Sequence, residues 1–304
     1  MEPGFINDYR AKRRAMHARW QQWIHGHETL ARFGTALAFA GMMGALAQIS
    51  IRTDLSPVPF TMQVFGASLM GGFLGRKWGT ISALLYVALG IIGLPMFAGQ
   101  TAAWDGFHPF GGFFVFATAL SSWYIIGFVA QAFIVGSIVD SRRTQRSGLL
   151  VGFAPLAVLG LLGFALLDAY FLSDYRTIYP TSAFPNAWFL LLTFGLVLIV
   201  GGVTWLAFTR KARQERIELF FANLVGLLAV YAIGSVGFLI LWHSLGNGPL
   251  PLSVWLAYTV LPFIPVDLAK ILLAISVLTL VRPTQHELDE PGWSESKEAS
   301  QTHV

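Results

Sequence analysis

The sequence predicts an all-α polytopic membrane protein, a bundle of helices embedded in lipid, from two features of its composition. Of its 304 residues, 55% are hydrophobic and only 12% are charged, about half the charged fraction of an average soluble domain. So few charges cannot cover a water-soluble globule of this size, which excludes a soluble enzyme, and the chain is too apolar to be disordered. The absence of cysteine excludes disulfides, thiolate metal sites and cysteine nucleophiles.

Successive apolar runs approach or exceed the roughly 20 residues that a helix needs to cross a bilayer. The second run is short and begins after two prolines, so we expect it to be tilted or incomplete. The last run contains Pro262 and Pro265, which break or restart a helix, so we expect an outer segment near 252–261 and a main helix from about Phe263. The predicted spans are 33–51, 60–75, 78–96, 112–139, 149–172, 187–208, 217–243 and 252–281.

The positions of lysine and arginine predict the orientation of these spans. With the N-terminus in the cytoplasm and alternating spans, 17 of the 20 lysines and arginines fall in cytoplasmic segments, whereas outer loops hold only Arg52 and Arg176. Cytoplasmic loops of membrane proteins carry such an excess. We therefore expect a multi-pass plasma-membrane protein with both termini in the cytoplasm. The net charge of +4 then reflects this bias and not a nucleic-acid partner.

The two ends of the chain are polar and differ from the apolar runs. Residues 1–32 are basic and aromatic, which favours either an amphipathic helix on the membrane surface or a solvated cytoplasmic segment. Residues 283–304 are acidic and have almost nothing apolar to bury, so we expect a disordered cytoplasmic tail.

Asp168, Asp267 and Lys270 lie inside predicted spans, where a charge at the centre of a lone helix costs about 2.5–3.5 kcal/mol. Asp168 lies near the outer end of its span and can reach the interface. Asp267 and Lys270 are three residues apart and project from one face of the last helix. Spacing alone favours neither of two interpretations. The pair either holds two helices together, or anchors a ligand, with the lysine binding a carboxylate and the aspartate accepting from N–H donors.

A long outer loop after the third predicted span is rich in glycine and aromatic residues. It contains Phe97, Gly99, Gln100 and Trp104, and residues 93–112 include no lysine or arginine. Glycines let the backbone approach a ligand closely, and aromatic rings supply apolar walls. Composition alone favours an ordinary turn-rich loop, whereas length and apolar character favour a lid.

Small residues recur at every fourth position of the first predicted span, at Ala36, Ala40 and Gly44. Such a stripe allows another helix to approach closely. The approaching helix belongs either to the same chain or to a partner protein.

Several stretches, taken together and in order, resemble the BioY family, the biotin-binding S components of energy-coupling factor (ECF) transporters. The resemblance covers roughly 33–140 and 217–281. The stretches are 47–51 (AQISI) with 57–63 (PVPFTMQ), 84–99 (LLYVALGIIGLPMFAG), 109–113 (PFGGF), 229–234 (AVYAIG) and 261–270 (LPFIPVDLAK).

The resemblance implies a six-helix bundle that captures biotin from outside the cell. It also implies docking on a membrane partner, the T component, which two cytoplasmic ATPases drive; this agrees with the lack of a nucleotide-binding motif in the chain. In this interpretation Ala36, Ala40 and Gly44 form the docking face. The implied substrate-binding residues are Asp267, Lys270, Gln63, Tyr86, Phe97, Gly99, Gln100, Trp104 and Tyr231.

Three features depart from the family pattern. Val266 stands where the family usually has glycine, and Gln100 and Trp104 stand where the lid tends to be glycine-rich. Residues 146–212 have no counterpart and contain two extra spans, which we predict to form an inserted helical hairpin because a pair of spans preserves sidedness. The predicted core is therefore split into four helices in 33–145 and two helices in 213–282.

Two other functions remain as alternatives on the sequence alone. One is a solitary secondary transporter of a small carboxylate vitamin, in which Asp267 cycles a proton. The other is an integral membrane enzyme, such as a lipid-modifying transferase, which needs catalytic acids or histidines converging at one membrane face; only Asp267 qualifies. We expect a transport component that is not an enzyme and has neither a metal site nor a cofactor.

Overall fold

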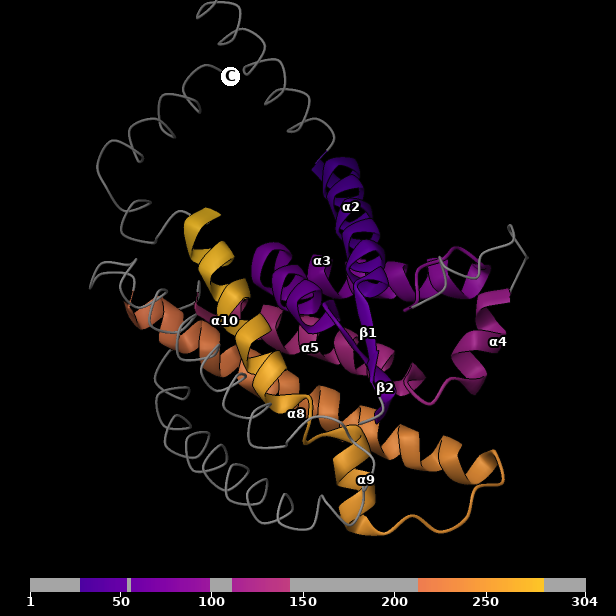
Figure 1. The fold of residues 1–304 in the computed structure, drawn as a ribbon. Coiled ribbons are helices and arrows are strands. Elements are labelled where there is room, and N and C mark those ends of the chain that lie inside the picture. Colours follow the sequence, from indigo (N-terminus) through magenta and orange to yellow (C-terminus); the bar gives the residue numbers. More distant parts are fainter. Residues whose placement is uncertain (1–27, 54–55, 99–110, 143–212, 282–304) are drawn as a thin grey trace, which may run out of the picture.

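The computed structural model describes residues 28–53, 56–98, 111–142 and 213–281. They form a bundle of helices with one small β-hairpin (Figure 1), which confirms the predicted helical fold class. The predicted inserted hairpin at 146–212, the acidic tail and most of the basic N-terminal segment lie outside the described residues.

Four helical segments in the described part of the chain are long and apolar enough to cross a membrane, which agrees with a multi-pass protein. They are Thr29–Gln48, Ser122–Ser141, Arg216–Ser244 and Leu252–Thr279. Each overlaps one of the spans predicted from the sequence.

The chain enters the bundle through α2 (Glu28–Gln48) and then forms an antiparallel hairpin of β1 (Ser50–Thr53) and β2 (Ser56–Thr61). The span predicted over 33–51 is therefore right as far as Gln48 and wrong beyond it. Two prolines in β2 explain why the chain forms a hairpin here and not more helix. Proline lacks an N–H and is tolerated in an edge strand but not in a helix interior. We refer to this end of the molecule as the β-hairpin end.

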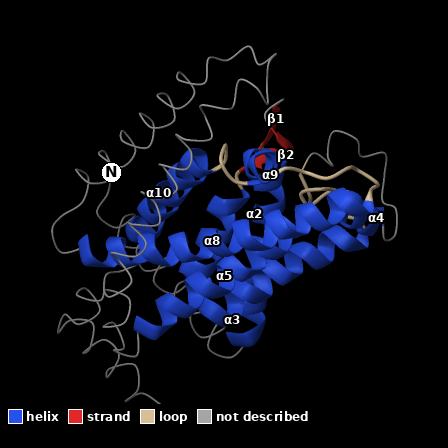
Figure 2. Cartoon of the chain, turned by 90° about the horizontal axis from the view of Figure 1, so that it is seen from below, coloured by secondary structure: helices blue, strands red, loops and turns tan. Residues whose placement is uncertain are grey.

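Ser56 joins the hairpin to α9 (Leu252–Thr259), and Figure 2 shows the two side by side. Its Oγ donates to the carbonyl oxygen of Tyr258 at 2.5 Å and accepts the N–H of Val58 at 2.9 Å. Val58 and Phe60 alternate inward from β2 and belong to the buried core. The hairpin therefore forms part of the bundle wall.

Helix α3 (Gln63–Ile92) turns back on itself at Gly75, which has φ 73° and ψ −173°. A positive φ favours glycine because it has no Cβ to clash with the backbone. Gly79, just after the turn, lies directly against the backbone of Met70, just before it, so the two halves run back along each other. These halves correspond to the separate spans predicted over 60–75 and 78–96.

The predicted span 112–139 is wrong as a single helix. The structure has a short helix, α4 (Gly111–Thr118), then a turn, then α5 (Ser122–Arg142). The turn is closed by the N–H of Ser122, which donates to the carbonyl of Ala119 at 2.9 Å. Serine hydroxyls compete for backbone hydrogen-bonding groups and weaken helix interiors. The serines at the start of α5 therefore favour a break in the helix, which the mean hydropathy of the run does not reveal.

The C-terminal part follows the sequence prediction closely. Helix α8 (Arg213–Ser244) covers the predicted span 217–243. Helix α9 ends at Thr259, and α10 (Ile264–Val281) begins between the two prolines, as predicted from Pro262 and Pro265. The N–H of Asp267 donates to the carbonyl of Phe263 at 2.8 Å, which starts the new helical ladder.

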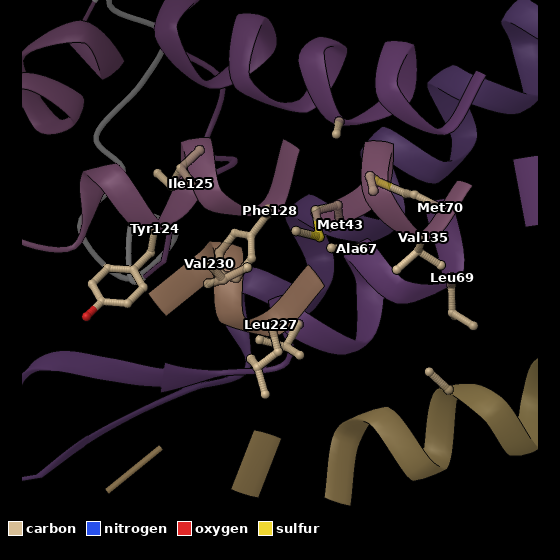
Figure 3. Packing of buried hydrophobic residues seen from close by; sticks show 14 of the residues in the cluster. Met43, Ala67, Leu69, Met70, Tyr124, Ile125, Phe128, Val135, Leu227 and Val230 are labelled. Carbon is tan, nitrogen blue, oxygen red and sulfur yellow. The ribbon is translucent and has the colours of Figure 1, made fainter. Parts of the chain in front are cut away.

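Helix α5 packs between α3 and α8, while α2 and α10 pack against α3. Figure 3 shows part of the resulting core, with buried side chains from α2, α3, α5 and α8 gathered between the helices. The starts of α3, α5 and α10 all face the β-hairpin end, where their side chains leave a cavity.

Candidate functional site

The cavity at the β-hairpin end has a volume of about 710 Å³, part of it open to solvent. Its lining has the character of a small-molecule site, in which apolar walls are combined with a few placed polar groups. Seven segments contribute: β2, the start of α3, the loop after α3, α4, the start of α5, the middle of α8, and the start of α10. The lining residues are Val58, Pro59, Thr61, Gln63, Val64, Phe97, Ala98, Val115, Phe116, Ala119, Ser121, Ser122, Tyr124, Ile125, Phe128, Val230, Tyr231, Phe263, Asp267 and Lys270.

Asp267 and Lys270 form a buried ion pair in the first turns of α10. The Lys270 Nζ donates to Asp267 Oδ1 at 2.6 Å, and the two residues are 6% and 4% exposed. Tyr231 of α8 donates from its hydroxyl to the other carboxylate oxygen at 2.9 Å. The aspartate is thus held by donors from two helices. Two further N–H groups of the lysine and further carboxylate lone pairs can serve a ligand.

Gln63 begins α3 and presents a second buried polar group to the cavity. Thr61 donates to its Oε1 at 2.8 Å, and its Nε2 donates to the Tyr86 hydroxyl at 2.7 Å. Tyr86 itself is buried behind Gln63 and is not among the cavity-lining residues. Tyr86 therefore orients Gln63, and Gln63 faces the cavity.

Phe97 closes the cavity from the loop that follows α3. Its ring meets Tyr86 edge-on at a centroid distance of 5.8 Å and lies 6.1 Å from the ring of Phe116 on α4. Gln48, the last residue of α2, holds this loop: its Nε2 donates to the carbonyls of Pro95 and Phe97, each at 3.0 Å. An amide from one helix thereby fixes the position of an aromatic wall on another segment.

The start of α5 supplies two polar residues to which the sequence reasoning assigned no role. Tyr124 donates from its hydroxyl to the carbonyl of Thr259 at 2.6 Å and so links α5 to the end of α9. Ser122 lines the cavity, is 1% exposed, and its Oγ has no hydrogen-bond partner among the described residues. In the sequence, both residues are hydroxyl-bearing residues within an apolar run. Averaging the hydropathy over that run conceals them.

Six of the nine predicted substrate-binding residues lie in the described part of the chain. The structure brings five of them to one cavity, namely Gln63, Phe97, Tyr231, Asp267 and Lys270. Tyr86 contacts this group from behind. Gly99, Gln100 and Trp104 lie outside the described residues.

The stripe of Ala36, Ala40 and Gly44 faces the interior of the chain. Ala36 and Ala40 are fully buried, and the Ser82 hydroxyl on α3 donates to the Ala36 carbonyl at 2.7 Å. Gly44 lies against the side chain of Met96. Intramolecular packing, one of the two interpretations of the stripe, therefore occupies these residues, and in this conformation they offer no surface to a partner.

The arrangement suits a compact ligand with an apolar middle and polar ends. Aromatic and aliphatic side chains form most of the wall, and the polar groups are concentrated on α10 with α8, on α3, and at the start of α5. In the portion of the chain that is described, no group of three or more His, Cys, Asp or Glu side chains could hold a metal ion. The polar groups can donate and accept hydrogen bonds around a buried molecule.

Comparison with known proteins identifies the family. The sequence model of the BioY family matches residues 22–197 and 189–287. The chain belongs to the BioY family. The two matches meet within the predicted insertion 146–212, and together they cover all the helices described above. As a BioY protein, the chain is a membrane transport component and not an enzyme.

Named relatives come from bacteria and archaea. The chain is 34% identical over 153 residues to the biotin transporter BioY of Thermotoga maritima, covering 49% of this chain and 83% of the relative. It is 36% identical over 142 residues to the biotin transporter BioY of Lactococcus lactis, covering 46% and 67%. A crystal structure of an S-component for biotin from an ECF-type ABC transporter gives a TM-score of 0.47 at 20% identity, covering 84% of this chain and 92% of that chain. The family assignment rests on the sequence matches.

Proposed function

We propose that this BioY protein is the substrate-binding S component of an ECF-type transporter and that it captures biotin from outside the cell. The observation that carries the proposal is the buried Asp267–Lys270 pair, held by Tyr231 and facing a cavity of about 710 Å³. Relatives that share the family are named biotin transporters. A ligand with a ureido ring, an apolar thiophane and a valerate carboxylate needs this combination of polar anchors and apolar walls.

Tight capture of so small a molecule requires nearly complete burial. A nanomolar dissociation constant corresponds to about −12.3 kcal/mol, or about −0.8 kcal/mol for each of roughly sixteen heavy atoms, which is above the usual efficiency of drug-sized ligands. Phe97 and Phe263, which line the cavity and are nearly inaccessible to solvent, can supply apolar contact. Asp267 and Gln63 can satisfy ligand N–H groups that burial removes from water.

The direction of transport and the partners complete the proposal. The excess of lysine and arginine in alternate segments supports a plasma-membrane protein with both termini in the cytoplasm. In that orientation the cavity opens to the outside. Energy for uptake comes from a T component and two cytoplasmic ATPases. Docking of the T component through Ala36, Ala40 and Gly44 requires α2 to separate from α3, because these residues are buried in the isolated chain.

Biotin binding by the purified chain without any partner is the decisive test. Isothermal titration in detergent should give saturable, approximately equimolar binding, because an S component holds its ligand before it meets the energising module. A solitary proton-coupled transporter would instead show uptake into vesicles by this chain alone, driven by a pH gradient. Uptake that needs no partner would contradict the S-component role even if biotin binds.

A further inference from the structure

The hydroxyl of Ser122 is the one cavity-lining side chain in the described residues whose buried polar atom lacks a hydrogen-bond partner. Ser122 is 1% exposed. A buried hydroxyl without a partner is unfavourable, and native proteins rarely retain one without a reason. The backbone N–H of the same residue already donates to Ala119, so the hydroxyl is the group left for a ligand.

Ser122 is also the first residue of α5, a helix of 21 residues. The aligned peptide dipoles of a helix place partial positive charge at its N-terminus, which favours an anion there. Residues on both sides of this start, Ala119, Ser121, Tyr124 and Ile125, line the cavity as well. The first turn of α5 and an unsatisfied buried hydroxyl therefore face the same space.

The charges elsewhere in the cavity favour this place for a ligand carboxylate. Among the described residues that line the cavity, only Asp267 and Lys270 are charged, and they neutralise each other at 2.6 Å. A carboxylate placed on Lys270 would also lie near the Asp267 carboxylate, and two like charges at close range repel. The start of α5 offers a donor and a positive potential with no acidic residue in its first turn.

Apolar side chains occupy the wall around these polar groups. Ile125 and Phe128 follow Ser122 along α5, and Val230 faces them from α8 beside Tyr231. An aliphatic arm can lie against this wall while the polar ring of the ligand reaches α10. Resting on the proposed biotin function, we infer that the Ser122 hydroxyl, at the N-terminus of α5, donates a hydrogen bond to the valerate carboxylate and thereby sets the orientation of the ligand.

This orientation assigns the ureido ring to the Asp267–Lys270–Tyr231 group. Asp267 then accepts from a ureido N–H, and one of the remaining N–H groups of Lys270 donates to the ureido oxygen. The ion pair stays intact, so no buried charge is left without its partner when the ligand binds. The specificity that follows is for a carboxylate over a neutral group of the same shape.

The test compares biotin with biotinamide, in which a neutral amide replaces the carboxylate, on the wild-type chain and on Ser122→Ala. We expect Ser122→Ala to bind biotin about tenfold more weakly, which equals about 1.4 kcal/mol, and to bind biotinamide less than about threefold more weakly. Ser137→Ala, which removes a hydroxyl from the same helix outside the cavity lining, should leave both affinities unchanged.

The thermal unfolding temperature of the ligand-free variant gives a second readout. It should stay the same or rise, because the substitution removes a buried hydroxyl that has no partner. A fall in this temperature would overturn the inference by showing that the hydroxyl is bonded within the chain. Unchanged biotin affinity, or equal losses for biotin and biotinamide, would also overturn it. If the wild-type chain binds no biotin, the proposed function itself fails and the inference fails with it.

Discussion

The carboxylate of Asp140, near the end of α5, accepts the backbone N–H of Arg76 at 2.8 Å, 64 residues away in the sequence. Arg76 is the first residue after the turn at Gly75, so this carboxylate caps the second half of α3. The N–H groups at a helix start have no partner within the helix, and an acidic cap also matches the helix dipole. The contact holds the turn at Gly75, at the end of the first half of α3 away from Gln63 and the cavity.

Removing this cap should destabilise the chain without affecting the ligand. We expect Asp140→Ala to lower the free energy of unfolding by about 0.5–2 kcal/mol, the usual range for loss of a capping side chain. Asp140→Asn keeps an acceptor oxygen and should recover part of the loss. Thermal unfolding in detergent and biotin titration measure the two effects. A normal unfolding temperature for Asp140→Ala would show that the contact carries no stability.

The buried ion pair should be required for ligand affinity. Asp267→Asn loses the charged acceptor and Lys270→Met loses the charged donor, so each leaves a buried ligand group unpaired at about 1–3 kcal/mol or more. We expect at least roughly tenfold weaker biotin binding for each variant, measured by titration.

The double variant Asp267→Asn, Lys270→Met separates a binding role from a structural one. If the pair only joins helices, each single variant loses stability, and the double variant recovers it and keeps most of its biotin affinity. Rescue of that kind, seen by thermal unfolding and titration together, would reject both residues as ligand contacts.

Gln48 should affect binding through Phe97. Gln48→Met removes the amide that donates to the carbonyls of Pro95 and Phe97 while nearly preserving side-chain length. We expect biotin affinity to fall several-fold and unfolding free energy to fall by about 1–2 kcal/mol, because two partly buried carbonyls lose their donor. Thr35→Ala, on the exposed side of the same helix, is the control and should change neither. If Gln48→Met and Thr35→Ala have the same biotin affinity and the same unfolding free energy, a positioning role for Gln48 is contradicted.

A methyl group added at Gly90 should displace the ring of Phe97 toward the cavity. A Cβ at this position would overlap the ring of Phe97, which Tyr86 and Phe116 confine on other sides. We expect Gly90→Ala to weaken biotin binding at least about tenfold, because overpacking costs about 1–3 kcal/mol. Gly41→Ala, which meets no atom within 4 Å, is the matched control and should be neutral or slightly stabilising. Normal binding by Gly90→Ala would show that the ring moves freely.

Orientation in the membrane can be checked with reporter tags. Tags at both termini and near Arg143 should be cytoplasmic, and tags within 173–184 should be outside, because of the distribution of lysine and arginine. Cysteine accessibility suits this test, since the chain has no native cysteine. Termini on opposite sides would require an odd number of spans and would reject both the topology and the inserted pair of helices.

Several features of the site were predictable because they depend on local chemistry. Two charges three residues apart in an apolar segment must share a helix face, and the prolines before them set where that helix starts, so the Asp267–Lys270 pair followed from spacing. Its proposed use as a ligand anchor does not follow from spacing, because an ion pair between helices has the same pattern. The glycine and aromatic residues around Phe97 likewise indicated an apolar wall of a binding site. They did not indicate that the amide of Gln48 donates to the carbonyl of Phe97 and holds this loop in place.

Hydropathy determined that this chain is a helical membrane protein and located most of its helices. A membrane-spanning helix can be recognised from its apolar composition and its length alone. Hydropathy misplaced the β-hairpin and the break before Ser122, because a window average does not register hydroxyls and prolines that redirect the backbone. Only the tertiary structure decided that Ala36 and Ala40 pack against α3. It also decided that the Ser122 hydroxyl lines the same cavity as Asp267 and Lys270 and has no hydrogen-bond partner among the described residues. Such facts depend on which segments meet in space, and residues far apart in the chain carry no local signal of their meeting.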